Sequence, residues 1–385
     1  MAVQLKPLEE QVIVITGASS GIGRATAEMA ADGGARLVLA ARNEEALREV
    51  ADECARRGGR AVVVAADVGK RADIERIAEV AEDSFGGFDT WVNDAAVALY
   101  GKMTEIPLED QRRQFEVNYW GVVNGSLVAA EHLRRRGGGA IINIGSVLSD
   151  RAMIYQSQYS ATKHAVKAFT EGLRMELEEE GAPISVTLIK PSSIDTPYPE
   201  HARNYLGSEA LDLPPPVYDP HLVGKAILHA AENPKRTLVV GLGGYMISLM
   251  GTHFPRLADY AMEATGYSSQ TTQGPGERER QRRDNLYSPR EDDVHSSLPG
   301  PGPRQTSFFL EAQMHPVATF ALFAGVGLAL AYAIGGFGTS AARHGPRHRA
   351  ASKRRAGDGE DLARVAMASY PSPDDTARGS ALARH

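Results

Sequence analysis

A tyrosine and a lysine four positions apart, Tyr159 and Lys163, are the side chains in this sequence best placed for acid–base chemistry. On a helix, residues at this spacing lie on one face, one turn apart. Reduction of a carbonyl needs a proton donor beside the oxygen while a hydride reaches the carbon. A free tyrosine has a pKa of about 10, and a neighbouring ammonium lowers that pKa by stabilising the phenolate. The pair alone is weak evidence, because such a pair often only lines a helix surface.

Two further polar residues precede this pair. Ser146 follows the apolar run Ala140–Ile144 and lies thirteen residues before Tyr159. A serine at the end of a buried strand commonly caps the segment that follows. Asn118 lies within a helical pattern, where asparagine is locally unfavourable because its side chain competes for backbone hydrogen bonds. Both positions are candidates for the same site.

A glycine-rich turn lies near the start of the chain. The apolar run Val12–Thr16 is followed by Gly17, Gly21 and Gly23, and then by a helical pattern. The pyrophosphate of a dinucleotide must approach the backbone closely at a helix N-terminus, where unpaired N–H groups and the helix dipole favour negative charge. Side chains would block that approach, so the turn needs glycine. We interpret it as a phosphate-binding loop; the alternative is a tight turn with a structural role only.

Short apolar runs alternate with longer helical patterns between residues 11 and 266. The runs are Val12–Thr16, Leu37–Ala41, Ala61–Ala65, Thr90–Asn93, Ala140–Ile144, Ser185–Ile189 and Thr237–Val240. The helical patterns include Gly21–Asp32, Glu44–Arg57, Arg71–Asp83, Glu109–Arg135 and Tyr159–Glu180. Runs rich in Val and Ile that scarcely alternate with polar residues are typical of strands buried on both faces. The alternation predicts an α/β fold, a doubly wound parallel sheet with right-handed crossovers.

In this setting the motifs resemble those of the short-chain dehydrogenase/reductase family. The loop Thr16–Gly23 reads TGASSGIG and the segment Tyr159–Lys163 reads YSATK, with Asn118 and Ser146 in the family's order between them. The resemblance runs from about Leu8 to Gly241 and is to the single-domain branch. It implies a Rossmann-like sheet of seven parallel strands.

The resemblance also implies catalytic roles for four residues. Tyr159 is the general acid/base, and Lys163 is its electrostatic partner and binds the nicotinamide ribose. Ser146 holds the substrate oxygen against the Tyr159 hydroxyl. Asn118 supports a water that links the lysine to solvent.

A nicotinamide cofactor is expected. The second strand ends at Ala41, where an NAD enzyme usually carries an acidic residue for the ribose 2′-OH. The next residue, Arg42, can pair with a 2′-phosphate, although it could also be a solvated residue at a helix start. We therefore expect NADP(H) rather than NAD(H). The resemblance, together with this argument, gives the cofactor-binding residues Gly17, Ser19, Ser20, Gly21, Ile22, Gly23, Arg42, Asp67, Val68, Asn93, Ala95, Tyr159, Lys163, Pro191 and Thr196.

Three residues depart from the family's pattern. Asp94 and Ala96 stand where the family usually carries Asn and Gly, and Ser192 replaces a glycine. Asp94 lacks the two amide donors of asparagine. Ala96 adds a methyl group near the adenosine ribose, or restricts φ if the glycine conformation is needed. We expect weaker stability or cofactor binding, without loss of the chemistry.

Three segments should shape the substrate site: Val147–Gln158, Ala96–Gly101 and Pro197–Tyr218. The third is rich in proline and in large apolar residues, which favours an apolar substrate; its His201 and Arg203 could bind a carboxylate, or could be solvated residues of a lid. No metal site is expected, because His and Cys do not cluster at ligand spacing. The helices Glu109–Arg135 and Tyr159–Glu180 commonly pair between subunits in the family, which suggests a homodimer or homotetramer.

Composition limits the class of protein. The chain has 385 residues, 43% of them hydrophobic and 23% charged, with a net charge of −6. These values exclude a mostly disordered chain, a collagen-like fibre and a multi-span membrane protein, and they do not suggest a nucleic-acid partner. The single cysteine, Cys54, allows no internal disulfide, and residues 1–10 do not resemble a signal peptide, so we expect a cytoplasmic protein.

The chain divides after the predicted catalytic domain, residues 1–266. Residues 267–315 are rich in Ser, Thr, Gln, Pro and Gly and are interpreted as a linker or an extended arm. Residues 316–342 form an apolar segment in which Val317–Phe337 carries no charge and is long enough to span a bilayer. Membrane association through 317–337 is therefore predicted, with a soluble helix or a flexible arm as the alternative. Residues 343–385 form a basic tail, predicted to be disordered.

The sequence thus predicts an NADP(H)-dependent oxidoreductase that interconverts a carbonyl and an alcohol. The alternative is a nucleotide-binding or scaffolding protein that keeps the fold without turnover, which the altered residues Asp94 and Ala96 and the long C-terminal extension would accommodate.

Overall fold

The computed structural model describes residues 3–207, 210–272, 284–290, 292–297 and 302–326. The chain separates into two compact units, residues 1–324 and residues 325–385.

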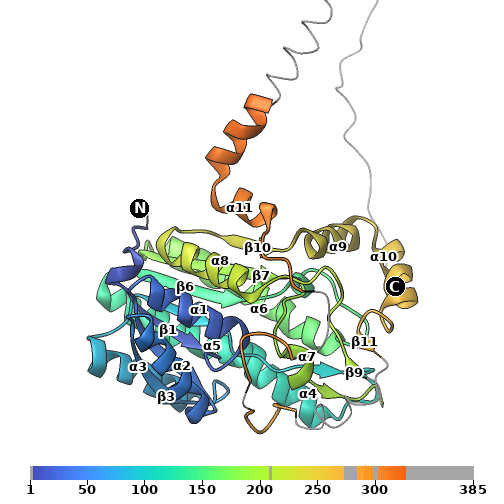
Figure 1. Ribbon diagram of the computed structural model, residues 1–385, viewed down its shortest axis with the longest axis horizontal. Helices are drawn as coiled ribbons and strands as arrows, with labels where there is room; N and C mark the ends of the chain where they lie inside the picture. Colours follow the sequence, from blue (N-terminus) through green and yellow to red (C-terminus); the bar gives the residue numbers. More distant parts are fainter. Residues whose placement is uncertain (1–2, 208–209, 273–283, 291, 298–301, 327–385) are drawn as a thin grey trace, which may run out of the picture. The chain divides into compact units, whose positions relative to one another are not determined.

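A sheet of seven parallel strands forms the centre of this unit (Figure 1). Across the sheet the strands are β10 (Thr237–Val240), β7 (Ile184–Pro191), β6 (Gly139–Ile144), β4 (Thr90–Asn93), β1 (Val12–Thr16), β2 (Arg36–Ala41) and β3 (Arg60–Ala65). Every pairing between them is parallel. The predicted doubly wound parallel sheet is confirmed, and each predicted strand lies within two residues of its observed bounds.

Helices cover both faces of the sheet. One face carries α1 (Gly21–Asp32), α2 (Glu44–Arg56) and α8 (Pro220–Glu232), and the other carries α3 (Arg71–Phe85), α5 (Gly121–Arg136) and α6 (Ser157–Glu179). The predicted helix Glu109–Arg135 is interrupted: α4 (Leu108–Phe115) and α5 are joined by one π-helical turn, η2 (Glu116–Trp120). Such turns inside α-helices occur frequently at functional sites.

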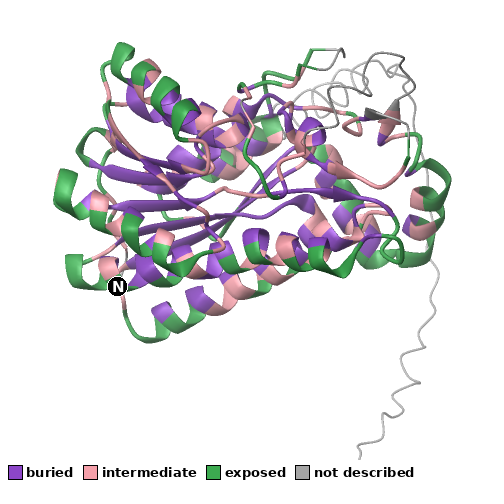
Figure 2. Cartoon of the chain, turned by 90° about the horizontal axis from the view of Figure 1, so that it is seen from below, coloured by how far each residue is buried: buried purple, intermediate pink, exposed green. Residues whose placement is uncertain are grey.

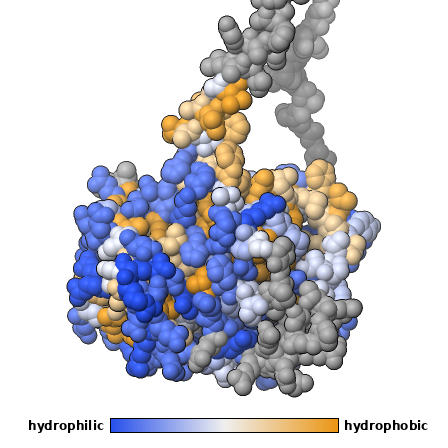
Figure 3. Space-filling view, in the orientation of Figure 1, coloured by the Kyte–Doolittle hydropathy of each residue, from blue (hydrophilic) through white to orange (hydrophobic). Residues whose placement is uncertain are grey.

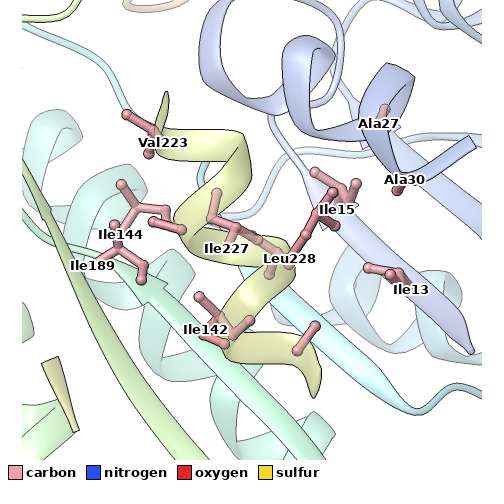
Figure 4. Packing of buried hydrophobic residues seen from close by; sticks show 14 of the residues in the cluster. Ile13, Ile15, Ala27, Ala30, Ile142, Ile144, Ile189, Val223, Ile227 and Leu228 are labelled. Carbon is pink, nitrogen blue, oxygen red and sulfur yellow. The ribbon is translucent and has the colours of Figure 1, made fainter. Parts of the chain in front are cut away.

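Alternate residues of each central strand belong to two apolar cores, one on each face of the sheet. Ile13 and Ile15 of β1 face α1 and α8, whereas Val12 and Val14 belong to the core under α3, α5 and α6. Figure 4 shows the first core, where Ile227 and other side chains of α8 meet β1, β6 and β7. In Figure 2 the strands are buried and the helices expose only their outer sides. Burial on both faces explains why these strands read as continuous apolar runs.

The strand order reverses beside β1, which lies between β2 and β4. The connections leave β1 toward one side of the sheet and β4 toward the other, so a crevice opens at the carboxyl ends of these two strands. Ligands of open parallel sheets bind in such a crevice. This edge is where the predicted glycine loop and the predicted catalytic residues should meet.

The segment beyond β7 builds a wall above this edge. It contains α7 (Tyr198–His201) and the short strands β8 (Arg203–Asn204) and β9 (Ala210–Leu211). β8 pairs with β5 (Leu99–Tyr100), from the segment after β4, and β9 pairs with β11 (Thr271–Thr272), from the segment after α10. After β10 the chain forms α9 (Leu242–His253) and α10 (Pro255–Thr265), which the sequence patterns do not single out.

The C-terminal arm returns to the catalytic domain. Leu286, Val294, Leu310 and Met314 are buried in it. In α11 (Phe308–Met314), the side-chain amide of Gln313 bonds both the N–H and the carbonyl of Val239, each at 2.9 Å. The amide of Gln313 thus bonds backbone groups at the open edge of β10 that a further strand would otherwise pair with.

The predicted membrane-associated segment is described only in part. Residues 316–326 are helical and expose Val317, Phe320 and Phe323, whereas residues 327–342 and the tail 343–385 lie outside the described residues. Figure 3 shows apolar surface on this helix and over α9 and α10. Among the helices that the structure describes, none combines the length and the apolar character that a membrane span requires.

Candidate active site

Three of the predicted catalytic side chains meet at the carboxyl end of β6. Ser146 lies two residues after this strand, and Tyr159 and Lys163 lie one turn apart on α6. The Lys163 Nζ donates to the carbonyl oxygen of Ile144 at 2.7 Å and lies 5.5 Å from the centre of the Tyr159 ring. The ammonium is therefore fixed between the end of the strand and the phenol.

Burial sets the proton affinities of this group. It raises the pKa of Tyr159, and hydrogen bonds to Ser146 and Tyr198 counteract the rise. Burial also lowers the pKa of Lys163 to about 8, against the attraction of the Asp94 carboxylate. The pKa of Asp94 itself is raised by burial to about 7, although Lys163 and the backbone N–H of Gly23 favour its charged form. The family's usual asparagine at position 94 would carry no such charge.

Asn118 lies in the π-helical turn, buried beside this group. Its Oδ1 accepts from the Val97 N–H at 2.8 Å, and its Nδ2 donates to the Val97 carbonyl at 3.0 Å and to Thr162 Oγ1 at 3.3 Å. The side chain thus ties the segment after β4 to α6, next to Lys163. It does not line the pocket described below.

Asn93 stabilises the sheet from within. Its side chain accepts from Trp91 Nε1 at 2.8 Å and donates to Asn143 Oδ1 at 2.8 Å and to Ser126 Oγ at 3.1 Å. Asn143 in turn donates to Thr170 Oγ1 of α6 at 3.0 Å. Buried polar groups that satisfy one another in this way fix the relative positions of neighbouring elements. Asn93 therefore acts on the site through β4, β6 and α6.

The glycine loop joins β1 to the N-terminus of α1. Gly17 has φ +75°, and a Cβ there would lie 2.9 Å from the backbone N of Ala95. A Cβ on Gly23 would lie 2.3 Å from the Gly17 carbonyl oxygen. Both glycines are required by close approach of the backbone, and the loop places the N-terminus of α1 at the crevice. This cradle fits the pyrophosphate of a dinucleotide.

Arg42 lies at the outer end of this cradle, but it is not a freely solvated residue. Its guanidinium donates to the carbonyl oxygens of Asn285 and Leu286, the latter at 3.3 Å. A second cation, Arg113, lies close by: it donates to Asp67 Oδ2 at 2.6 Å and also to the Leu286 carbonyl at 3.3 Å. Sequence reasoning did not single out Arg113, because nothing in α4 marks it as close to β2.

One continuous pocket joins these parts. It is lined by most of the predicted cofactor residues, Gly17, Ser19, Ser20, Gly21, Ile22, Arg42, Asp67, Val68, Ala95, Pro191 and Thr196, and by Ser146, Tyr159 and Lys163. Gly23 and Asn93 are not part of the lining; their roles are the packing and hydrogen bonding described above. Residues of the C-terminal arm, Asn285, Pro289, Arg290 and Asp292, complete the lining on the outside.

The substrate end of the pocket is mostly apolar. The predicted segments contribute Val97, Tyr100, Val147, Leu148, Met153, Gln156, Pro197, Tyr198, His201, Leu213 and Pro214, and α9 and α10 add Gly244, Ile247 and Met262. These two helices are fastened to the loop after β6 through an ion pair between Arg151 and Asp259 and a hydrogen bond from Ser248 Oγ to the Val147 carbonyl at 3.1 Å. Their contribution comes from residues far from the motifs in sequence.

Arg203 has a structural role. It donates to Asp110 Oδ2 at 2.9 Å and to Asp284 Oδ2 at 3.0 Å, and so joins α4 to the arm. His201 lines the pocket, with its Nε2 2.6 Å from Asp292 Oδ2. Neither side chain is the solvated lid residue that the sequence allowed.

The other two departures from the family's pattern are accommodated locally. Among the described residues, Tyr155 alone of the non-glycine residues has a positive φ, so Ala96 occupies no conformation that demands glycine. Ser192 faces α9 at Gly244, where a Cβ would lie 2.6 Å from the Ser192 hydroxyl. The glycine in α9 leaves the space that the serine fills.

A group of potential metal ligands, Asp219, His221 and His295, lies beside the N-terminus of α8. Its polar atoms already have partners: Asp219 accepts from His221 Nδ1 at 2.8 Å and from Gln305 Nε2 at 2.8 Å, and His295 Nδ1 lies 3.0 Å from Asp195 Oδ2. Hydrogen bonding between the arm and α8 explains this group.

The motifs and the geometry agree with comparisons to known proteins. The family model for short-chain dehydrogenases matches residues 11–205. The uncharacterized oxidoreductase YxnA of Bacillus subtilis (strain 168) is 46% identical over 333 residues, which cover 84% of this chain and 90% of that protein. The uncharacterized oxidoreductase SA2266 of Staphylococcus aureus (strain N315) is 32% identical over 60% of this chain and 95% of that protein. The chain therefore belongs to the short-chain dehydrogenase/reductase family and is an oxidoreductase.

Solved structures of the family superpose on the catalytic domain. A short-chain dehydrogenase/reductase from Burkholderia phymatum in complex with NAD has a TM-score of 0.60 at 26% identity, covering 66% of this chain and 96% of its own. An alcohol dehydrogenase from the archaeon Thermococcus sibiricus, complexed with 5-hydroxy-NADP, has a TM-score of 0.52 at 25% identity, covering 60% of this chain and 95% of its own. The fold is thus one that binds nicotinamide cofactors. These structural neighbours include one complex with NAD and one with a derivative of NADP.

The charge of Asp94 should appear in the pH dependence of the reaction. Ionised Asp94 favours the ammonium form of Lys163, whose pKa burial has lowered to about 8. Asp94→Asn removes that attraction, so the pKa of Lys163 should fall further and the alkaline limb of the kcat/KM profile should move to lower pH by roughly 0.5–1 unit. Asp83→Asn, on the exposed side of α3, is the matched control and should leave the profile unchanged. An unmoved limb in Asp94→Asn would contradict this electrostatic role.

Proposed function

We propose that this protein interconverts a carbonyl and an alcohol by hydride transfer to or from NADP(H), on an apolar substrate. The observation that carries the proposal is the single pocket that Ser146, Tyr159 and Lys163 share with the glycine loop. A scaffold that only binds a nucleotide has no use for a phenol, a hydroxyl and a buried ammonium gathered at the far end of the cofactor groove.

The chain's own residues handle the proton and the substrate oxygen. A nicotinamide held along the groove supplies or accepts the hydride. In the reductive direction Ser146 donates a hydrogen bond to the carbonyl oxygen, and the Tyr159 hydroxyl gives that oxygen its proton. The Lys163 ammonium stabilises the phenolate left behind, and it is held in place by the Ile144 carbonyl. Asn118 keeps α6 and the segment after β4 in register, so that the lysine stays under the phenol.

The shape of the pocket supports an apolar substrate. Around the reacting oxygen, the walls are side chains such as Val147, Met153, Leu213, Ile247 and Met262. Tyr198 lies against Tyr159, with ring centres 5.4 Å apart, and its hydroxyl donates a hydrogen bond to Gln156 Oε1 at 3.1 Å. A wall of this kind favours aliphatic or aromatic carbonyl compounds over charged ones.

Turnover with a panel of apolar aldehydes and ketones tests the reaction. NADPH oxidation by the full chain should fall by roughly 10²- to 10⁴-fold in Tyr159→Phe, because the proton donor is lost while the ring remains. Tyr260→Phe, on an exposed side chain of α10, is the matched control and should keep the wild-type rate. An unchanged rate in Tyr159→Phe would remove this tyrosine from the mechanism. A wild-type chain that binds NADPH but turns over none of the panel would favour the scaffold.

The preference for NADP(H) rests on the end of β2. Ala41 offers no carboxylate to the ribose 2′-OH, and Arg42 lines the pocket at the same point. The arm's carbonyls occupy two of its donor groups, and a guanidinium has five N–H donors, so others remain for a phosphate. Arg113 adds positive charge nearby, although its pairing with Asp67 offsets it.

Cofactor selectivity can be measured directly. Arg42→Ala should weaken NADPH binding by at least about tenfold more than NADH binding, because only NADPH has a 2′-phosphate to lose its partner. Arg48→Ala, in a surface ion pair with Glu44, is the matched control. Kd values from nucleotide fluorescence give the comparison. Equal losses for the two nucleotides would reject the NADP(H) preference.

We also infer that the protein is a homo-oligomer that pairs through α5 and α6. Three large apolar side chains are exposed along these helices and the π-helical turn: Trp120, Leu127 and Met175. Exposed apolar side chains that gather on one face mark interaction surfaces. Sedimentation of the full chain should show a dimer or tetramer that the double variant Trp120→Glu, Met175→Glu shifts toward the monomer; a monomeric wild type would contradict the inference.

A further inference from the structure

Part of the C-terminal arm, here named the strap, runs across the mouth of the pocket. The strap comprises residues 284–290 and 292–297. In Figure 1 it belongs to the orange-brown loop between α1 and α7. Asn285, Pro289, Arg290 and Asp292 of the strap line the same pocket as the glycine loop.

One side of the strap is fastened to the rim formed by α1 and β2. The carbonyl of Asp293 accepts from the Gly21 N–H at 3.0 Å, and its carboxylate lies 3.4 Å from Arg24 Nη1. Asn43 Nδ2 donates to the Arg290 carbonyl at 3.2 Å. Together with the bonds from Arg42, these contacts hold the strap along the adenosine end of the groove.

The other side is fastened to the opposite rim, around α7. The Asn285 N–H donates to the His201 carbonyl at 2.9 Å. The buried carboxylate of Glu200 accepts from Ser297 N at 2.8 Å, Ser297 Oγ at 2.7 Å and Ser296 Oγ at 2.8 Å. The strap is thus bonded on both sides of the groove, at the start of α1 and around α7.

Two buried apolar side chains anchor the strap to the catalytic domain. Leu286 is 1% exposed and belongs to the core under α3 and α5, and Val294 is 6% exposed. Arg290 and Asp292, which lie between them in the chain, line the pocket. The burial of Leu286 and Val294 near the two ends of the strap holds it in a defined position beside the groove.

One polar atom of the strap has no partner. Asn285 Oδ1 is buried, lines the pocket, and accepts no hydrogen bond from any residue that the structure describes. A buried acceptor without a donor is costly, so such an atom marks a place where a ligand donates. It lies beside Arg42, at the end of the groove where Asp67 and Val68 are expected to flank the adenine.

From these observations we propose that the strap is the outer wall of the cofactor-binding site. It holds the adenosine half of a dinucleotide against the glycine loop, and Asn285 Oδ1 accepts a hydrogen bond from the adenine amino group or a ribose hydroxyl. The proposal rests on the proposed function only in taking NADP(H) as the ligand. It adds a binding residue from beyond residues 11–205, the range that the family model matches. The cofactor must enter and leave by opening of the strap.

Loosening the strap should therefore release the cofactor faster. In the full chain, Glu200→Gln removes the charge that three strap donors share, and the dissociation rate constant of NADPH, followed by fluorescence, should rise about tenfold. Glu311→Gln breaks a surface ion pair with Lys225, away from the groove, and should leave the rate constant unchanged. Slower release or tighter binding in Glu200→Gln would overturn the proposal, since it would mean that the strap competes with the cofactor for Gly21 and Arg42.

The role of Asn285 has its own test. Asn285→Ala should weaken NADPH binding severalfold. The analogue that carries hypoxanthine in place of adenine offers no amino group: weaker binding of this analogue to the wild type, but not to Asn285→Ala, assigns the donor to adenine. Equal binding of the two nucleotides to the wild type, with a loss in Asn285→Ala, assigns it to a ribose hydroxyl. An unchanged Kd for NADPH in Asn285→Ala would remove Asn285 from the site.

A measurement on the unaltered chain distinguishes this proposal from the proposed reaction. Amide hydrogen exchange in the strap should slow when NADPH binds, because the closed wall is stabilised by what it covers. Faster exchange would show displacement and overturn the proposal. A chain that binds NADPH with a protected strap but reduces no carbonyl would leave the strap proposal standing and reject the proposed reaction. A chain that does not bind NADPH would reject both.

Discussion

The buried ammonium of Lys163 is the constraint on which the site depends. An ammonium removed from water needs fixed partners, and here the carbonyl of Ile144 and the field of Asp94 provide them. The carbonyl stands at the end of β6 and the carboxylate at the end of β4, so the lysine is stable only if both strands end at the same edge. The parallel sheet meets this condition, and the position of Tyr159 one turn away on α6 follows from it.

A buried polar framework keeps these elements in register. Asn93 connects β4 to Asn143 of β6, and Asn143 reaches Thr170 of α6. The π-helical turn places the Asn118 side chain where it bonds both polar backbone atoms of Val97. The side chains of Asn93, Asn118, Asn143 and Thr170 are not part of the pocket lining, yet each bond limits how far the catalytic side chains can move apart. The carboxylate of Asp94 changes the charge of the site without changing the framework.

The C-terminal arm contributes part of the wall of the pocket. The strap reaches both rims, and Gln313 of α11 covers the edge of the sheet at β10. The relative from Bacillus subtilis matches 84% of this chain, which is more than residues 1–266 comprise, so the match extends into the arm. In two of its ion pairs with the catalytic domain the arm supplies the carboxylate: Asp293 pairs with Arg24, and Asp284 with Arg203. Such contacts hold a segment that has few apolar residues of its own.

The amino-acid sequence by itself determined the sheet, the glycine loop and the pair Tyr159 and Lys163, because each is a local pattern: an apolar run, a turn that excludes side chains, and a spacing of one helical turn. Only the tertiary structure decided which remote segments complete the pocket. The interruption of the predicted helix at Asn118, the burial of Asp94 beside Lys163, and the return of Asn285 to the side of Arg42 each depend on contacts between residues far apart in the chain. Local periodicity carries no information about such contacts. A polar stretch therefore resembles a linker in the sequence, because the surface that binds its few apolar side chains is formed only in the tertiary structure.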